Sequence, residues 1–239
     1  MRTNKRAFSL TIIVLLPFFA STVAWASSES TSSVQSSESR HNNVQVDATQ
    51  NEAADEKQNP GKWAIEIGAA VISQNDVHSA LYGQFDREDG PAGGEIYKIT
   101  GYYTLKVFDW ELWGSTYHPQ VEIPLSIAIF DENARSPFMN YNAAIDVRWT
   151  DWPWNKIIYT TISTGGGLGY FEIIPLIDII KHPDEDRSHV KFWWPFQITL
   201  ALPQYKNHQI VFYSDHWSGG HIFDKGGFDA FGIGYKYIF

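Results

Sequence analysis

The C-terminal segment alternates between two kinds of side chain, and this pattern limits the fold more than any other feature of the chain. Bulky apolar residues occupy one phase and glycine or lysine the other, with Ile238 as the exception: Phe231, Ile233, Tyr235, Tyr237 and Phe239 alternate with Gly232, Gly234 and Lys236. A period of two is that of a β-strand. Bulky groups on one face and small or polar groups on the other are typical of a barrel wall whose outside contacts lipid and whose narrow inside is polar.

Seven more segments of strand length precede this one, so the number of strands is even. They cover residues 62–73, 95–108, 117–131, 138–150, 156–171, 190–203 and 207–215, and the last covers 228–239. No helix-period segment of ordinary length separates them, which favours antiparallel hairpins over parallel β-α-β units. Backbone polar groups in hydrocarbon must be paired within the protein, so a membrane sheet has to close on itself. We therefore predict an all-β fold, an eight-stranded antiparallel transmembrane β-barrel over residues 62–239.

The alternation also predicts the contents and the rims of this barrel. Side chains fill the lumen of so small a barrel, and its polar interior is expected to include Glu66, Lys98, Asp146 and Arg148. Aromatic residues near strand ends suit interfacial girdles, although core packing would also explain them: Trp110, Trp113, Tyr117, Trp149, Trp152, Trp154, Trp193 and Trp194. Residues 173–180 either continue the fifth strand or form a short helix. The terminal Phe239 resembles the assembly signal of bacterial outer-membrane barrels.

The N-terminal region differs from the rest of the chain. A basic stretch (Arg2, Lys5, Arg6), an apolar core over residues 7–20 and a small-x-small cleavage site at Ala24-Trp25-Ala26 predict a secretory signal peptide over residues 1–26. The apolar run is too short to favour the alternative of a membrane anchor. Residues 27–61 are rich in Ser, Gln, Asn and acidic residues and lack aromatic ones, so we expect a disordered polar leader.

The composition excludes several classes of function. The chain has no cysteine, which rules out a disulfide scaffold, an iron–sulfur cluster and a thiolate nucleophile. Its net charge of −9 becomes −12 when the three cations of the signal peptide are removed, and this acidity argues against a nucleic-acid partner. The scattered histidines lack metal-ligand spacing, so we predict neither a metal nor a cofactor: His41, His78, His118, His182, His189 and His208.

A chemically specific stretch lies just before the last strand. His216 and Ser218 share a phase with the apolar Ile210, so an extended chain places both on the lipid-facing side with α-carbons about 6 to 7 Å apart. An imidazole at that distance can activate a serine hydroxyl as a nucleophile. Asp229 falls in the same outward phase, two residues before Phe231, and His216 on the neighbouring strand is its expected partner. This location suits an enzyme whose substrate is a lipid.

The run from Asp215 to Phe239, with His-x-Ser, glycines, Gly227-Phe228-Asp229 and an aromatic-rich final strand, resembles the lipid A 3-O-deacylase (PagL-type), or acyloxyacyl hydrolase, family of outer-membrane barrels. The resemblance implies a bacterial outer-membrane esterase that removes the ester-linked 3-O acyl chain of lipid A, with lipopolysaccharide as substrate. It implies Ser218 as nucleophile, His216 as base and Asp229 as the acid that orients the base. The sequence departs from the family at Gly219, where asparagine is common, and at Asp229, where glutamate is usual. The backbone N–H groups of Gly219 and Gly220 would then bind the developing oxyanion.

Two other functions are compatible with the same pattern. A non-catalytic small barrel with a structural, adhesive or lipid-contact role would leave His216 and Ser218 at a loop edge, and a secreted soluble barrel would bind a hydrophobic ligand in its interior. Nearby polar residues are interpreted structurally, with Asp215 as a loop cap and with Asp224 and Lys225 in a solvated turn. His221 is the backup base should His216 be misplaced.

Overall fold

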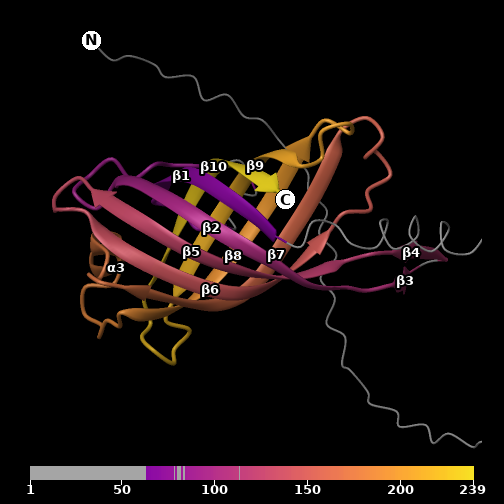
Figure 1. The fold of residues 1–239 in the computed structure, drawn as a ribbon. Helices are drawn as coiled ribbons and strands as arrows, with labels where there is room; N and C mark the ends of the chain where they lie inside the picture. Colours follow the sequence, from indigo (N-terminus) through magenta and orange to yellow (C-terminus); the bar gives the residue numbers. More distant parts are fainter. Residues whose placement is uncertain (1–62, 78, 80–81, 83, 113) are drawn as a thin grey trace, which may run out of the picture. The chain divides into compact units, whose positions relative to one another are not determined.

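The computed structural model describes residues 63–77, 79, 82, 84–112 and 114–239, so the predicted signal peptide and leader lie outside the described residues. Eight strands form a closed barrel in the order β1-β10-β9-β8-β7-β6-β5-β2, and neighbouring strands are antiparallel (Figure 1). Their bounds are β1 Trp63–Ser73, β2 Gly94–Val107, β5 Gln120–Glu132, β6 Phe138–Trp149, β7 Tyr159–Phe171, β8 Val190–Ala201, β9 His208–Ser218 and β10 Gly227–Ile238. The predicted fold class is confirmed, and the strand ends differ from the predicted ones by at most three residues.

Among the elements whose bounds the structure describes, three short ones lie in the connections between these strands. β3 (Trp110–Leu112) and β4 (Ser115–Tyr117) pair with each other in the connection between β2 and β5, a hairpin that the sequence did not predict. α3 (Leu176–Lys181) lies between β7 and β8, so the short helix is the correct interpretation of residues 173–180. Pro175 precedes the helix and has no N–H to give to a sheet, which explains why the strand does not continue through it.

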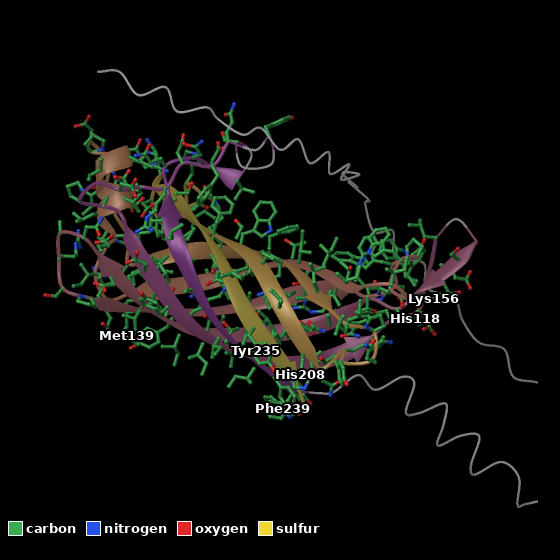
Figure 2. The ribbon with its side chains drawn as sticks, turned by 90° about the horizontal axis from the view of Figure 1, so that it is seen from above. His118, Met139, Lys156, His208, Tyr235 and Phe239 are labelled. Carbon is green, nitrogen blue, oxygen red and sulfur yellow. The ribbon has the colours of Figure 1, made fainter. Side chains whose placement is uncertain are left out.

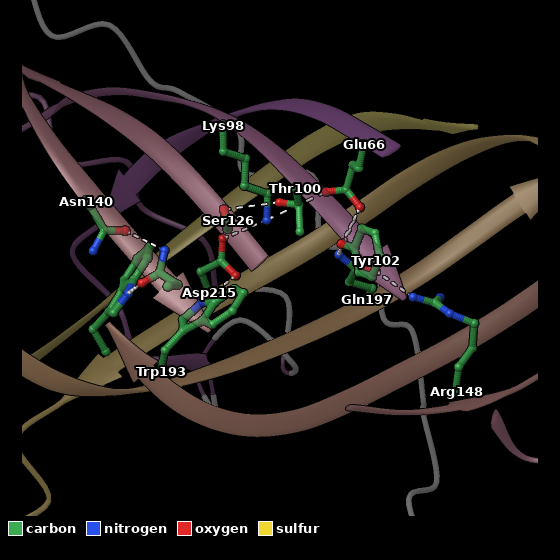
Figure 3. Close-up of polar contacts among 12 residues, drawn as sticks. Glu66, Lys98, Thr100, Tyr102, Ser126, Asn140, Arg148, Trp193, Gln197 and Asp215 are labelled. Carbon is green, nitrogen blue, oxygen red and sulfur yellow. Dashed lines mark hydrogen bonds and ion pairs between the residues drawn. The ribbon is translucent and has the colours of Figure 1, made fainter. Parts of the chain in front are cut away.

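The lumen is filled with paired charges and aromatic rings. The four residues predicted for the polar interior are all buried there: Glu66, Lys98, Asp146 and Arg148. Lys98 Nζ lies 2.9 Å from Asp215 Oδ2, and Arg148 Nε lies 2.9 Å from Glu122 Oε2 (Figure 3 shows part of this network). Because buried charges are costly unless they are paired, these contacts tie the strands to one another across the lumen.

One predicted girdle residue lies in the lumen instead. Trp193 is 2% exposed and donates its indole N–H to Asp215, whereas its neighbour Trp194 is 59% exposed on the outer wall. Adjacent strand residues face opposite sides, so only one of the two can contact lipid. The prediction of an interfacial role for Trp193 is therefore wrong. Trp113 lies outside the described residues.

The outer wall carries apolar side chains along the length of the barrel. Half-exposed aliphatic and aromatic residues alternate with lumen residues on every long strand, and they include Ile67, Ile99, Leu125, Ile127, Ile145, Leu168, Ile210, Phe212 and Ile233. Figure 2 shows His208, Tyr235 and Phe239 together near the end of the wall where the chain terminates, while Met139 lies toward the opposite end. Such an apolar outer band is what contact with hydrocarbon requires.

The connections differ between the two ends of the barrel. The end with α3 carries the connections 74–93, 133–137, 172–189 and 219–226, while the end with β3 and β4 carries 108–119, 150–158 and 202–207 (Figure 1). The longest connections are thus gathered at the α3 end. This is also the end at which β9 runs into β10, where the sequence predicts its chemistry.

Candidate active site

His216 and Asp229 face each other on the outer wall. The two residues are directly opposite in the register of β9 and β10, and His216 Nδ1 lies 2.8 Å from Asp229 Oδ1. The His216 side chain is 33% exposed and that of Asp229 only 3%. Asp215, which precedes His216, and Trp217, which follows it, are both buried in the lumen, so His216 faces outward. The structure therefore brings this predicted pair together.

Ser218 lies on the same face, one step nearer the α3 end. β9 remains extended to this residue, which pairs with Gly227 on β10 and with Phe192 on β8. Among the described residues, the Ser218 hydroxyl has no hydrogen-bond partner, and none joins it to the imidazole. In structures without substrate, a nucleophile and its base are often farther apart than in the reacting complex, and a serine hydroxyl changes position by rotation about the Cα–Cβ bond.

The two glycines after Ser218 are not equivalent. The N–H of Gly219 donates to the carbonyl of Gly226 at 2.9 Å, so it is not available to an oxyanion in this conformation. Gly220 has φ of 58°, and among the described residues its N–H has no hydrogen-bond partner. A Cβ built on Gly220 would lie 2.6 Å from the Phe192 ring. Of the two predicted oxyanion donors, only Gly220 has its N–H unengaged.

Asp224 is not part of a solvated turn. It is buried, its Oδ2 lies 2.7 Å from Lys191 Nζ, and it also accepts the backbone N–H groups of Ser188 and Gly226. Burial by itself would raise the pKa of Asp224, but these hydrogen bonds and the charge of Lys191 lower its pKa below the ordinary value. The earlier interpretation holds only for Lys225, which is exposed.

Asp215 also differs from the prediction. It is not a loop cap but a lumen residue within β9, bound by Lys98 at 2.9 Å and by the Trp193 indole at 3.0 Å. The strand extends three residues beyond the predicted end because the pairing of β9 with β8 and β10 continues to Ser218. His221, the predicted backup base, is exposed in the turn with φ of 59°.

Two further residues near the pair were not predicted as its neighbours. Trp194 of β8 is opposite His216 in the strand register and donates its indole N–H to Thr164. Lys181, the last residue of α3, donates to the carbonyl of Ser73, and Ser73 is opposite Asp229 on β1. Burial lowers the pKa of Lys181, while the charge of Asp229 opposes that effect more than any other group. These neighbours come from elements distant in sequence, which explains why periodicity did not reveal them.

Comparisons with known proteins define the class of protein. No protein-family model and no curated protein matches the chain. The solved structure of the outer membrane enzyme PagL is 14% identical, with 73% of this chain and 99% of that chain covered and a TM-score of 0.50. Neisserial surface protein A also matches, at 9% identity, with 74% of this chain and 96% of that chain covered and a TM-score of 0.43. The N-terminal β-barrel domain of Pseudomonas aeruginosa OprF matches at 13% identity, with 74% of this chain and 99% of that chain covered and a TM-score of 0.39.

The closed barrel and the match to the PagL structure identify the fold of the chain as an eight-stranded antiparallel β-barrel, the fold of that outer membrane enzyme. At 14% identity, the likeness to the PagL structure is a likeness of fold. Among the described residues, no cluster of histidine and acidic side chains could hold a metal ion, and no helix is long and apolar enough to cross a membrane.

Proposed function

We propose that this barrel is an esterase that removes the ester-linked 3-O acyl chain of lipid A. The observation that carries the proposal is the 2.8 Å contact between His216 Nδ1 and Asp229 Oδ1 on the lipid-facing side of the wall, with Ser218 on the same face. In this assignment Ser218 is the nucleophile, His216 the general base and Asp229 the residue that orients the base.

The position of the pair argues against a purely structural role. A carboxylate on the lipid-facing side of a barrel costs free energy that a lumen carboxylate, surrounded by partners, does not. The lumen already holds the ion pairs that link the strands, such as Lys98 with Asp215 and Arg148 with Glu122. An outward aspartate therefore adds nothing to stability that the lumen does not supply better, and a reaction with a membrane lipid accounts for its location.

The end of the barrel at which the site lies supports a lipopolysaccharide substrate. In outer-membrane barrels the longer loops are extracellular and the shorter turns periplasmic. The longest connections, 74–93 and 172–189, are at the same end as Ser218, which supports a site near the outer leaflet. Lipid A occupies that leaflet, and its ester bonds lie at the boundary between sugar and hydrocarbon.

The reaction then proceeds in two steps. His216 Nε2 takes the proton from Ser218 Oγ as this oxygen attacks the ester carbonyl, while Asp229 holds the imidazole through Nδ1 and stabilises the imidazolium. The N–H of Gly220 stabilises the oxyanion, and its collapse releases the sugar hydroxyl, which takes the proton from His216. A water molecule, deprotonated by His216, hydrolyses the acyl-serine and releases the fatty acid.

Mass spectrometry of lipid A from cells with and without the protein tests the proposal. Wild type should convert lipid A to a species that lacks the 3-O acyl chain, and Ser218→Ala should abolish the conversion with unchanged heat-modifiable migration. Ser214→Ala is a matched control, because Ser214 also lies on the outer face of β9 but four residues from Ser218 and deeper in the wall. Equal lipid A profiles with wild type and Ser218→Ala would exclude the esterase.

A non-catalytic barrel that contacts lipid is the second candidate. The unengaged hydroxyl of Ser218 and the occupied N–H of Gly219 favour it, since two parts of the predicted machinery are not assembled in the structure. This candidate predicts that lipid A is chemically unchanged in cells that carry wild type. The same mass spectra therefore separate the two functions.

A further inference from the structure

The turn that follows Ser218 has an unusual backbone. Residues 219–226 connect β9 to β10, and two consecutive residues of this turn, Gly220 and His221, have φ of 58° and 59°. The left-handed region is disfavoured for a residue with a Cβ, so His221 keeps this conformation only because the surrounding contacts impose it. The contacts that impose it are therefore of functional interest, because the N–H of Gly220 is the remaining candidate oxyanion donor.

Asp224 supplies two of the hydrogen bonds that hold this turn, and the carbonyl of Gly219 accepts two others, from the N–H groups of Ile222 and Phe223. Its backbone carbonyl accepts the N–H of His221 at 3.0 Å, and its Oδ1 accepts the N–H of Gly226 at 2.8 Å. Its carboxylate also packs against Gly219, since a Cβ built there would lie 2.0 Å from Asp224 Oδ1. The Asp224 side chain and backbone thus contact the chain on both sides of Gly220.

Asp224 is in turn fixed to the barrel wall by a buried cation. Its Oδ2 lies 2.7 Å from the Nζ of Lys191 on β8, and Lys191 Nζ also lies 2.9 Å from Asp178 Oδ2 on α3. Lys191 immediately precedes Phe192, which is opposite Ser218 in the strand register. The same segment of β8 therefore binds Asp224 of the turn and pairs with Ser218 of β9.

Stability alone does not explain this arrangement well. Both side chains of the Lys191–Asp178 pair are fully buried, and buried ion pairs commonly give less stability than apolar residues of the same volume. What an ion pair with fixed partners does provide is one defined geometry. A defined geometry of the turn next to Ser218 would affect the position of the Gly220 N–H during the reaction.

We propose that Asp224, fastened by Lys191, is a positioning residue for the hydrolysis. It holds the turn 219–226 in the conformation that directs the N–H of Gly220 toward the oxyanion formed at Ser218. This inference rests on the proposed esterase function. It predicts an effect on the chemical step rather than on substrate affinity, because the Asp224 side chain is buried and bound to Lys191 and so is not exposed to a substrate.

Asp224→Asn and Asp178→Asn form a matched pair for the test. Each removes one of the two carboxylates on Lys191, but only Asp224 makes hydrogen bonds within the turn, whereas Asp178 lies on α3 and packs against Gly226. In a detergent assay with purified lipopolysaccharide, Asp224→Asn should lower kcat by about tenfold or more with little change in KM, while Asp178→Asn stays within about threefold of wild type. Asp224→Glu, which keeps the charge, should recover part of the lost kcat.

Hydrogen exchange provides a readout that does not depend on activity. The amides of residues 219–226 should exchange faster in Asp224→Asn than in wild type, while those of β9 are unchanged in both variants. Equal exchange in wild type and Asp224→Asn, or equal losses of kcat in the two Asn variants, would overturn the positioning role. If wild type itself has no esterase activity, the proposed function fails, and faster exchange would then show an anchor of structural importance only.

Discussion

The contact between His216 and Asp229 gives the sharpest prediction for catalysis. Asp229→Asn keeps the size of the side chain but removes the charge, and its amide group can present N–H to the ring and stabilise the wrong tautomer. The lost interaction is a 2.8 Å contact to a carboxylate whose side chain is 3% exposed, so water cannot replace it. A loss of about 10²- to 10⁴-fold in kcat is expected, equivalent to about 3 to 5 kcal/mol of transition-state stabilisation.

The assay measures the release of free fatty acid from purified lipopolysaccharide, with initial rates at several substrate concentrations. KM should change much less than kcat, because Asp229 orients the base and does not bind the substrate. Asp229→Glu should be more active than Asp229→Asn, since it keeps the charge on a longer arm. Full activity of Asp229→Asn in a correctly folded barrel would refute the reasoning, even if Ser218 and His216 proved essential.

Three further predictions concern the barrel and the turn. Lys98→Met leaves the buried carboxylate of Asp215 without its cation and should destabilise the barrel by about 3 to 5 kcal/mol in urea unfolding from lipid vesicles. Gly220→Ala should lower kcat and destabilise the turn by about 1 to 2 kcal/mol, because φ of 58° and the Phe192 ring at 2.6 Å both oppose a Cβ; unchanged kcat would remove Gly220 from the mechanism. The pKa of Asp224 is lowered in the folded state, so the contribution of its carboxylate to stability is complete above the ordinary aspartate pKa. This contribution is lost as the pH falls through the pKa of the folded state. The thermal midpoint of wild type should therefore fall more steeply with acid than that of Asp224→Asn.

The strand pattern was readable from the sequence because a membrane barrel imposes a period of two on every strand. Each residue faces either lipid or a packed lumen, so the identity of one side chain predicts its orientation and that of its neighbours. For this reason the inward phase of Glu66 and Lys98 and the outward phase of His216 and Asp229 followed from alternation alone. The distance between His216 and Asp229 also needed the register of β9 and β10: sequential strands usually pair, but only the structure shows that these two residues are directly opposite.

The sequence could not predict partners that come from distant strands. Lys191 meets Asp224 across 33 residues and Lys98 meets Asp215 across 117 residues, and no local pattern encodes which buried charges pair when a sheet closes. For the same reason Asp224 was interpreted as solvated and Asp215 as a loop cap. The hydrogen bond of the Gly219 N–H to Gly226 depends on the conformation of the turn, which is set by these same contacts.

The sequence by itself determined the fold class, the strand segments and the face on which His216, Ser218 and Asp229 lie, because these depend on a period that lipid and lumen impose residue by residue. Only the tertiary structure decided which backbone N–H near Ser218 is unengaged and which cation holds the turn beside it. Those features depend on the closure of the barrel, which brings β8, α3 and the β9–β10 turn together, and closure is a property of all eight strands at once.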